Sequence, residues 1–319
     1  MAARGKHRRL FVLTGLLLLY ALACLLSRGF AHFMLSRLSG PAMRALHRLT
    51  VPISFPLAEP LAFAAGVAII LALAAAGLRA LSRRNAAPLR HWLRGALWAA
   101  LCIGGSLLAL WLPAMVAPME APPAPNASQL EWLCGQLIDA LNAAELSFPE
   151  AAESLRRAPE AAKLPDAIVK GARYPEWMRA ASISGLFVPL TGEALVDVTA
   201  PAPLIPFTAV HELMHLTGIA DEGAANIAAW ERCLSAGGAF ADSARLWALR
   251  YAMGMLLRAD DDAWQRAHEK MKDPLSQVFQ LSGNAAIPAD RRAPGLPSLS
   301  LRRGDYTALI GHLIAQGFT

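Results

Sequence analysis

The sequence predicts a mainly helical protein with a small β edge, in which three N-terminal transmembrane helices precede a domain outside the lipid. The hydrophobic fraction of 55% and the mean hydropathy of +0.37 are high for a soluble enzyme. Three uncharged stretches account for the excess, and each is close to the length at which a helix crosses the hydrocarbon core. They are residues 10–27, 61–78 and 95–112.

The charge of the chain divides at the same boundary as its hydropathy. Residues 1–125 contain 13 Lys and Arg against 2 acidic residues, whereas residues 126–319 contain 17 against 22. A nucleic-acid-binding surface would place its basic excess on the domain that phosphates can reach, so we expect no nucleic-acid partner. The basic residues instead flank the hydrophobic stretches, as residues that set membrane topology do.

The positions of Lys and Arg also predict the orientation of the three spans. Four precede the first stretch and five lie between the second and third, against four in the segment 28–56, which we expect to be a loop. This majority favours a cytoplasmic N-terminus, so that residues from about 113 onward would lie outside the cytoplasm. A cleaved signal peptide ending near Cys24 is the alternative, but further apolar residues follow Cys24 directly and favour a retained span.

Proline marks the domain boundary. Residues 113–125 are rich in proline and predict an extended linker, which separates a membrane domain at 1–112 from an outer domain at 126–319. Helical spacing of apolar residues predicts amphipathic helices in the outer domain at 130–141, 240–258 and 306–314. We expect Cys134 and Cys233 to be buried and unpaired, although an oxidising compartment would allow a disulfide.

Residues 183–206 differ from the helical remainder of the outer domain. β-Branched and aromatic residues flank Thr191-Gly192-Glu193, which predicts two short strands joined by a turn. Because proline cannot donate a hydrogen bond to a sheet, Pro189 predicts that the first strand lies at an edge. Such an edge is able to pair with an extended peptide.

One motif in the sequence indicates a site for metal binding and hydrolysis. His211 and His215 lie in a segment, 207–217, that follows Pro206 and ends at Gly218, as a short helix with a glycine C-cap would. Residues four apart share a helix face, so both imidazoles can bind one ion, while Glu212 lies beside it. Two histidines with an intervening carboxylate as general base are the arrangement of a zinc metallohydrolase.

A catalytic zinc site needs a third protein ligand and an open position. Glu222 would supply this ligand from the start of a following helix, 222–234, as in gluzincins. Asp221 would supply it in a variant of the metzincin pattern, in which a turn at Gly218 returns the chain to the metal. Asp221 is also a favoured N-cap, and Glu222 would suit the first helical turn as a solvated acid. We favour Glu222 and keep Asp221 as the alternative.

The run 182–233 resembles the bacterial membrane family known as domain of unknown function 3810. The matching residues are Ser184, Gly185, Pro189, Thr191, Gly192, Glu193, Ala194, Pro206, Phe207, Thr208, His211, Glu212, His215, Gly218, Glu222, Ala225 and Asn226. The resemblance implies a multi-pass protein of the bacterial cell membrane with a zincin-like α+β metallopeptidase domain of the gluzincin type. The family carries a second glutamate where this chain has Ala224. If that glutamate is the family's ligand, Asp221 or Glu222 would have to replace it here, or the site would be inactive.

A zincin-like site also needs a hydrogen-bond donor for the developing oxyanion. Tyr306 is preferred because Asp305-Tyr306 echoes the same family, with Tyr251, His268 and His312 as alternatives and a core role for Tyr306 left open. The expected function is that of a membrane-anchored peptidase with Zn²⁺ as cofactor, Glu212 as general base and a peptide or protein as substrate. The alternative is a catalytically inactive zincin-fold membrane protein that binds or scaffolds.

Overall fold

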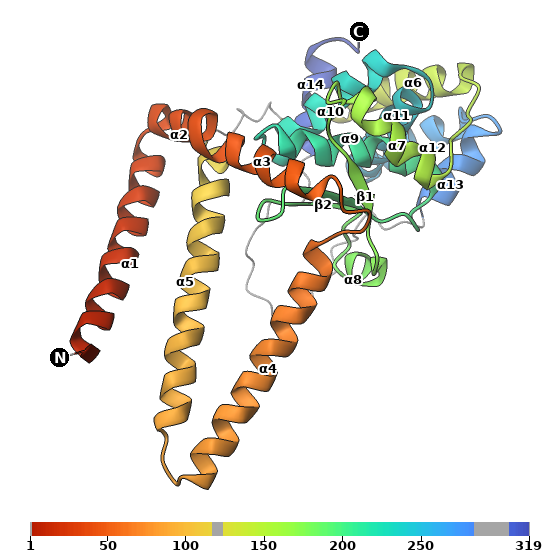
Figure 1. Cartoon of the computed structure of the whole chain (residues 1–319). Helices are drawn as coiled ribbons and strands as arrows, with labels where there is room; N and C mark the ends of the chain where they lie inside the picture. The colour runs from red at the N-terminus through yellow and green to blue at the C-terminus, as the bar shows by residue number, and fades with distance from the viewer. Residues whose placement is uncertain (1, 117–123, 284–305, 319) are drawn as a thin grey trace. The chain divides into compact units, whose positions relative to one another are not determined.

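The computed structural model describes residues 2–116, 124–283 and 306–318 and confirms a mainly helical chain with one three-stranded sheet (Figure 1). Two compact units are present: residues 1–117 together with 188–192, and residues 118–187 together with 193–319. The expected linker at 113–125 is not extended at its start, since its first residues continue a long helix. Most of the rest of this linker, 117–123, lies outside the described residues.

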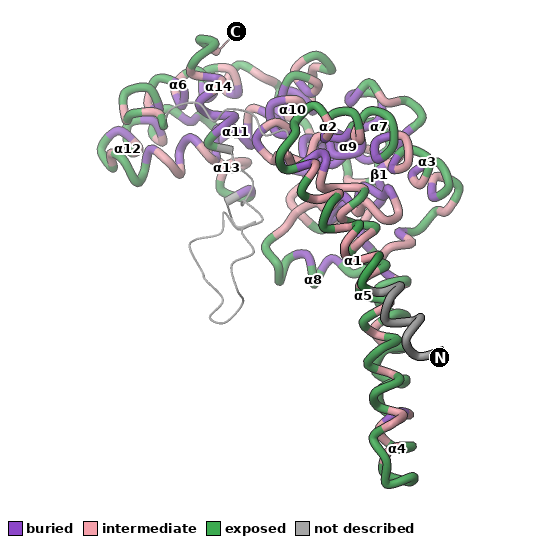
Figure 2. The backbone as a smooth tube through the Cα atoms, turned by 90° about the vertical axis from the view of Figure 1, so that its left-hand side faces the viewer, coloured by how far each residue is buried: buried purple, intermediate pink, exposed green. Residues whose placement is uncertain are grey.

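The first unit consists of long apolar helices and a shorter helical segment between them. Its elements are α1 (Ala2–Leu26), α2 (Arg28–Met34), the π-helical turn η1 (Leu35–Ser39), α3 (Gly40–Thr50), α4 (Ala58–Ser82) and α5 (Ala87–Met115). α4 and α5 are each long and apolar enough to span a membrane, and α1 qualifies when it is taken together with residues 28–50, from which it is bent by 117°. The surface of α4 is exposed along most of its length (Figure 2), as that of a lipid-facing helix would be.

The expectation of a loop at 28–56 was wrong, because residues 28–50 are helical. Ser27 caps α2 by accepting a hydrogen bond from the Phe30 amide at 3.2 Å. On α3 the buried residues Met43, His47 and Thr50 recur at helical spacing, so this helix has one packed face. Its frequent arginines leave no long apolar run, which is why the sequence suggested a loop.

The packed face of α3 holds the turn 188–192. His47 Nδ1 donates to the Gly192 carbonyl at 2.7 Å, and Thr50 Oγ1 donates to the Thr191 carbonyl at 3.4 Å. Gly192 has a φ of +68° and lies so close to α3 that a β-carbon there would be 2.7 Å from the Met43 carbonyl oxygen. Only glycine meets both demands without strain.

The sheet belongs mainly to the second unit and has the strand order β1-β3-β2. The two predicted strands are β2 (Gly185–Val188) and β3 (Glu193–Val196), and β2 is an edge strand as Pro189 indicated. β1 (Val169–Gly171) pairs in parallel with β3, with Val169 opposite Ala194. With three residues, β1 is too short to show an alternating pattern in the sequence.

Helices account for most of the second unit. They are α6 (Ala127–Ala143), α7 (Ala151–Ala161), α8 (Pro175–Ala180), the 3₁₀ turn η2 (Ala202–Leu204), α9 (Ile205–Leu216), α10 (Glu222–Ala236), α11 (Gly238–Ala259), α12 (Asp261–Glu269), α13 (Leu275–Gly283) and α14 (Tyr306–Ala315). Every residue of α9 is buried, and α7, α10, α11 and β3 pack against it. Figure 2 shows this helix as part of the buried interior. Cys134 and Cys233 are buried and free, which confirms the prediction of unpaired residues.

Candidate metal centre

The helix α9 carries the two motif histidines in the interior of the second unit. Pro206 lies in its first turn, where its missing N–H costs no hydrogen bond, and the Phe207 amide donates to Ser243 Oγ of α11 at 3.1 Å. The helix ends before Gly218, whose φ of +99° turns the chain away. α10 then begins at Glu222 with Asp221 as N-cap.

Three side chains converge between α9 and the start of α10. His211 Nε2 lies 3.2 Å from His215 Nε2 and 3.2 Å from Glu222 Oε2, and His215 Nε2 lies 3.6 Å from Glu222 Oε1. One ligand atom from each of the three lies within 4.8 Å of the others. At Zn–N distances of about 2.0–2.1 Å in a tetrahedral arrangement, two ligand nitrogens lie about 3.3 Å apart. The residues present therefore fit a zinc ion.

The backbone after the motif orients His215. Its Nδ1 donates to the Ile219 carbonyl oxygen at 2.6 Å. Because that oxygen can only accept, the proton lies on Nδ1 and the Nε2 lone pair is left for a metal. The turn at Gly218 brings the Ile219 carbonyl back to the helix, so the glycine of the motif contributes to ligand geometry as well as to helix termination.

His211 is oriented differently. Its Nδ1 is buried without a hydrogen-bond partner among the described residues, and so are both amide atoms of Asn226. Asn226 is near enough to favour the charged form of His211.

Glu212 lies on the same helix but outside the convergent cluster. Its side chain is buried, and burial raises its pKa to about 8 against the opposing effects of His211 and of the Phe187 backbone amide, which donates to the carboxylate. Gly185 of β2 lies against the same carboxylate, because a β-carbon at that position would be 2.8 Å from Glu212 Cδ. The edge strand β2 thus borders Glu212. A glycine within a predicted strand is the signal of such close approach, and it was available in the sequence.

The charges in the cluster shift the pKa of each member. Burial lowers the pKa of His215 to about 4, with the neighbouring His211 acting in the same direction. Burial also acts to lower the pKa of His211, but the hydrogen bond that its Nε2 donates to Glu222 and the charges of Glu212 and Glu222 raise it above its usual value. The two histidines then keep the pKa of Glu222 below its usual value in spite of burial. Glu222 is therefore a carboxylate at neutral pH, as a metal ligand must be.

The other predicted site residues have different surroundings. Asp221 accepts a hydrogen bond from the Ala224 amide at 2.9 Å, which is the N-cap role, and it is Glu222 that reaches the histidines. Tyr306 begins α14, and its side chain lies outside the described part of the structure. Burial raises the pKa of Tyr251 of α11 to about 12, and the negative charge of Glu222 acts in the same direction. His268 instead stacks on Trp264 of α12.

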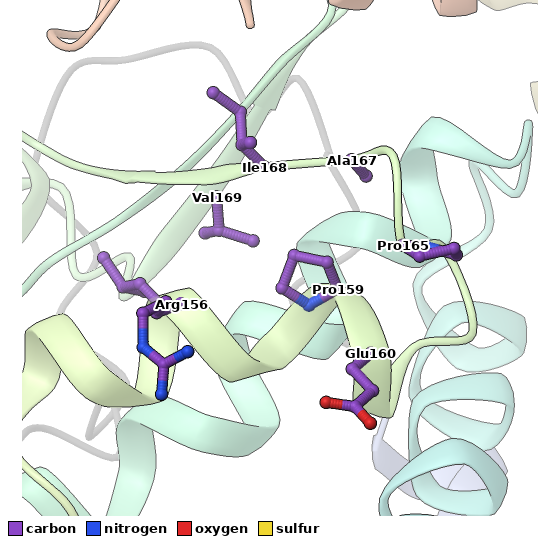
Figure 3. A pocket seen from close by; sticks show the side chains of 8 residues that line it. Arg156, Pro159, Glu160, Pro165, Ala167, Ile168 and Val169 are labelled. Carbon is purple, nitrogen blue, oxygen red and sulfur yellow. The ribbon is translucent and has the colours of Figure 1, made fainter.

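A separate hollow of about 510 Å³ lies between α7 and the chain that enters β1 (Figure 3). Pro159 of α7 and Val169 of β1 face one another across it, and Arg156 and Glu160 lie along its helical side. None of its lining residues belongs to the histidine cluster. The histidine cluster is thus located elsewhere in the second unit.

Comparisons with known proteins give one match. The model of a family described as "Protein of unknown function (DUF3810)" matches residues 40–284. No curated protein and no solved structure matches the chain. The matched segment contains the whole of the cluster formed by His211, His215 and Glu222.

Proposed function

The chain belongs to the DUF3810 family, and for this member we propose the function of a membrane-anchored, zincin-like metallopeptidase that holds Zn²⁺ through His211, His215 and Glu222. The observation that carries the proposal is the convergence of two imidazole nitrogens and a carboxylate within 4.8 Å. Two histidines and a glutamate are the ligand set of gluzincin-type catalytic sites, in which a fourth position stays open. The Glu222 side chain is 36% exposed, so solvent reaches this side of the cluster.

In the proposed reaction, Glu212 acts as the general base beside the metal ligands. A bound Zn²⁺ would act as a Lewis acid and make water acidic enough to attack a carbonyl at neutral pH. Glu212 then takes the proton of the attacking water and delivers it to the departing amine. Its pKa of about 8 places this group close to the operating pH, where proton transfer in both directions is favourable.

Tyr251 is the donor we propose for the developing oxyanion. Burial raises its pKa to about 12, so its hydroxyl keeps a proton to donate at neutral pH. The Glu222 charge acts on the same hydroxyl, which is consistent with a position beside the cluster. We prefer Tyr251 among the candidates from the sequence because the charge of Glu222 acts on its hydroxyl.

The substrate class follows from the strand beside Glu212. β2 is an edge strand, so a peptide in extended conformation can add to the sheet through main-chain hydrogen bonds. A peptide bound there would lie next to the proposed general base, since Phe187 and Gly185 of β2 both adjoin Glu212. We therefore propose unfolded or loop segments of proteins as substrates, met outside the cytoplasm if the charge distribution sets the topology.

The proposal is tested on the full-length chain in detergent. We expect about one zinc per chain by elemental analysis, loss of that zinc in His215→Ala, and retained zinc without hydrolysis of a mixed peptide library in Glu212→Gln. Zinc-free wild-type protein prepared without chelators would refute the metal site. Zinc-loaded protein that cleaves no peptide of the library would refute the peptidase and leave a metal-containing scaffold.

A further inference from the structure

The helical segment 28–50 carries a basic and apolar surface that the proposed catalytic function does not use. On α3 the buried face points Met43, His47 and Thr50 into the protein, as described above. Arg44 and Arg48, one turn apart, form an exposed basic strip beside that face. Around the remaining side of α3 lie Ala45 and Leu49, and Leu49 is 72% exposed.

The preceding turns of the segment repeat this combination. In η1 the arginine Arg37 is exposed, and beside it Leu38 is 55% exposed. In α2 the exposed Phe33 precedes Arg37 by four residues. Neither Arg37 nor the two arginines of α3 forms a salt bridge with any residue that the structure describes. The segment therefore presents guanidinium groups that have no counter-ion within residues 2–116, 124–283 and 306–318, next to exposed apolar side chains.

This composition excludes a span through the hydrocarbon core. Four arginines in 23 residues are too many charges for the interior of a bilayer, where each would have to be desolvated. The segment is also bent by 117° from the end of α1, closer to a right angle than to a continuation. Arginines and large apolar residues on neighbouring faces of one helix are typical of helices that lie in the head-group region.

The segment is connected to the ends of the long apolar helices. It starts where α1 ends, leads into the start of α4, and packs against α5 through η1 (Figure 1). α1 and α5 are joined near this level by the Tyr20 hydroxyl, which donates to the Ala109 carbonyl at 3.1 Å. If α4 and α5 both cross the bilayer, residues 28–57 and residues beyond 115 emerge on the same side. The segment would then begin and end at the same side of the bilayer.

We propose that residues 28–50 form an interfacial helix that binds anionic phospholipid head groups, with Arg37, Arg44 and Arg48 pairing with lipid phosphates. Leu38 and Leu49 insert between the adjoining acyl chains. Arginine suits this role because its planar guanidinium forms two parallel hydrogen bonds to a phosphate. The binding surface rests on the membrane helices alone and does not depend on the peptidase proposal.

The test is a titration of the full-length chain in neutral detergent with short-chain phosphatidylglycerol. The midpoint temperature of thermal unfolding is measured at each lipid concentration. Phosphatidylglycerol is expected to raise the midpoint in a saturable way, whereas phosphatidylcholine and inorganic phosphate do not. The triple variant Arg37→Gln/Arg44→Gln/Arg48→Gln is expected to bind phosphatidylglycerol on the order of 100-fold more weakly, at about fivefold per arginine near an anionic surface.

A matched control changes three arginines at the opposite ends of α4 and α5, Arg83→Gln/Arg84→Gln/Arg90→Gln, and is expected to retain at least half of the lipid-induced shift. If the first triple variant does not fold, the single substitutions Arg44→Gln and Arg48→Gln carry the same test. An undiminished shift in these variants would overturn the proposal, and so would an equal shift with phosphatidylcholine or with inorganic phosphate.

Discussion

Gly185 and Glu212 are in such close contact that no side chain fits between them. A β-carbon at Gly185 would lie 2.7 Å from Glu212 Cγ and 2.8 Å from Cδ, well inside van der Waals distance. The glycine of the edge strand thus fixes how near the strand comes to the proposed general base. Any side chain at 185 has to move either the carboxylate or the strand.

The substitution Gly185→Ala is expected to lower peptide hydrolysis about 100-fold, since a displacement of about 1 Å at the reacting groups has an effect of this size. Zinc content should stay at the wild-type level, because the three atoms nearest to a β-carbon at Gly185 all belong to Glu212, which is not one of the proposed ligands. Gly135→Ala is the matched control, as a β-carbon on that helical glycine meets no atom within 4 Å. Full activity in Gly185→Ala would show that Glu212 needs no defined distance from β2.

Tyr251→Phe is expected to lower the turnover number by about 100- to 1,000-fold, the usual cost of removing one oxyanion donor. The ring stacks on Trp247 at 5.8 Å between centroids, and phenylalanine keeps that contact. Tyr306→Phe should leave turnover unchanged. Steady-state kinetics of the two variants measures the turnover number, with zinc content as a control. A low turnover number in Tyr306→Phe rather than in Tyr251→Phe would contradict the assignment.

The buried ion pair of Lys170 and Glu193 stabilises the sheet only while both partners are present. Their side chains are 5% and 0% exposed, and Lys170 Nζ donates to Glu193 Oε1 at 2.7 Å. Glu193→Gln is expected to cost about 3–5 kcal/mol because it removes the negative charge that faces a buried ammonium, whereas Lys170→Met/Glu193→Leu should recover most of that loss. Denaturant-induced unfolding measures the free energy of unfolding of both variants.

The control for this pair is Glu153→Gln, which breaks the exposed contact of Glu153 with Arg156 at 2.6 Å. Exposed pairs contribute little, so its unfolding curve should match that of the wild type. A double variant as unstable as Glu193→Gln would show that packing of these two side chains, rather than their charge, determines stability.

Stability should fall with pH above about 9 because two thiols stay protonated in the folded chain. Burial raises the pKa of Cys134 from 9.0 to about 12 and raises the pKa of Cys233 as well. The unfolded chain releases these protons as pH rises above 9, so each thiol lowers the free energy of unfolding by up to about 1.4 kcal/mol per pH unit. Unfolding at pH 8, 9 and 10 should show a shallower decline in Cys134→Ala/Cys233→Ala, and parallel declines would refute the assignment.

Gly192→Ala is expected to destabilise the chain through backbone strain and through a clash with α3. The φ of +68° disfavours alanine, and its β-carbon would lie 2.7 Å from the Met43 carbonyl oxygen and 2.9 Å from the His47 α-carbon. Gly317→Ala shares the positive φ but meets no atom within 4 Å, so it isolates the backbone contribution. The difference between their unfolding free energies should be about 1–3 kcal/mol, and equal losses would argue against the clash.

The elements predicted best from the sequence are those with local signals. The motif helix between Pro206 and Gly218, the helix that starts at Glu222 and the strand with Pro189 at its end all follow from capping, turn and edge rules. The segment 28–50 was missed because its arginines interrupt every apolar run. β1 was missed because three residues have no measurable period.

Only part of the candidate site could be predicted from the local sequence. The choice between Glu222 and Asp221 depends on which carboxylate the Ala224 amide engages, and that is decided by the geometry of the turn. Gly185 is 27 positions from Glu212 in the chain, and no spacing rule relates a strand residue to a helix residue in this way. The roles of the cluster in metal binding and hydrolysis remain predictions for the experiments above.

The turn 188–192 has a practical consequence for anyone preparing this protein. A fragment beginning at residue 126 would lack the apolar helices, but it would also lack His47 and Thr50, whose side chains donate to the carbonyls of Gly192 and Thr191. The excised fragment would expose these two carbonyls to water and would lack the helix against which Gly192 packs, next to the strand that borders Glu212. Inactivity of such a fragment would not test the proposed function, so the intact chain extracted from membranes is the better starting material.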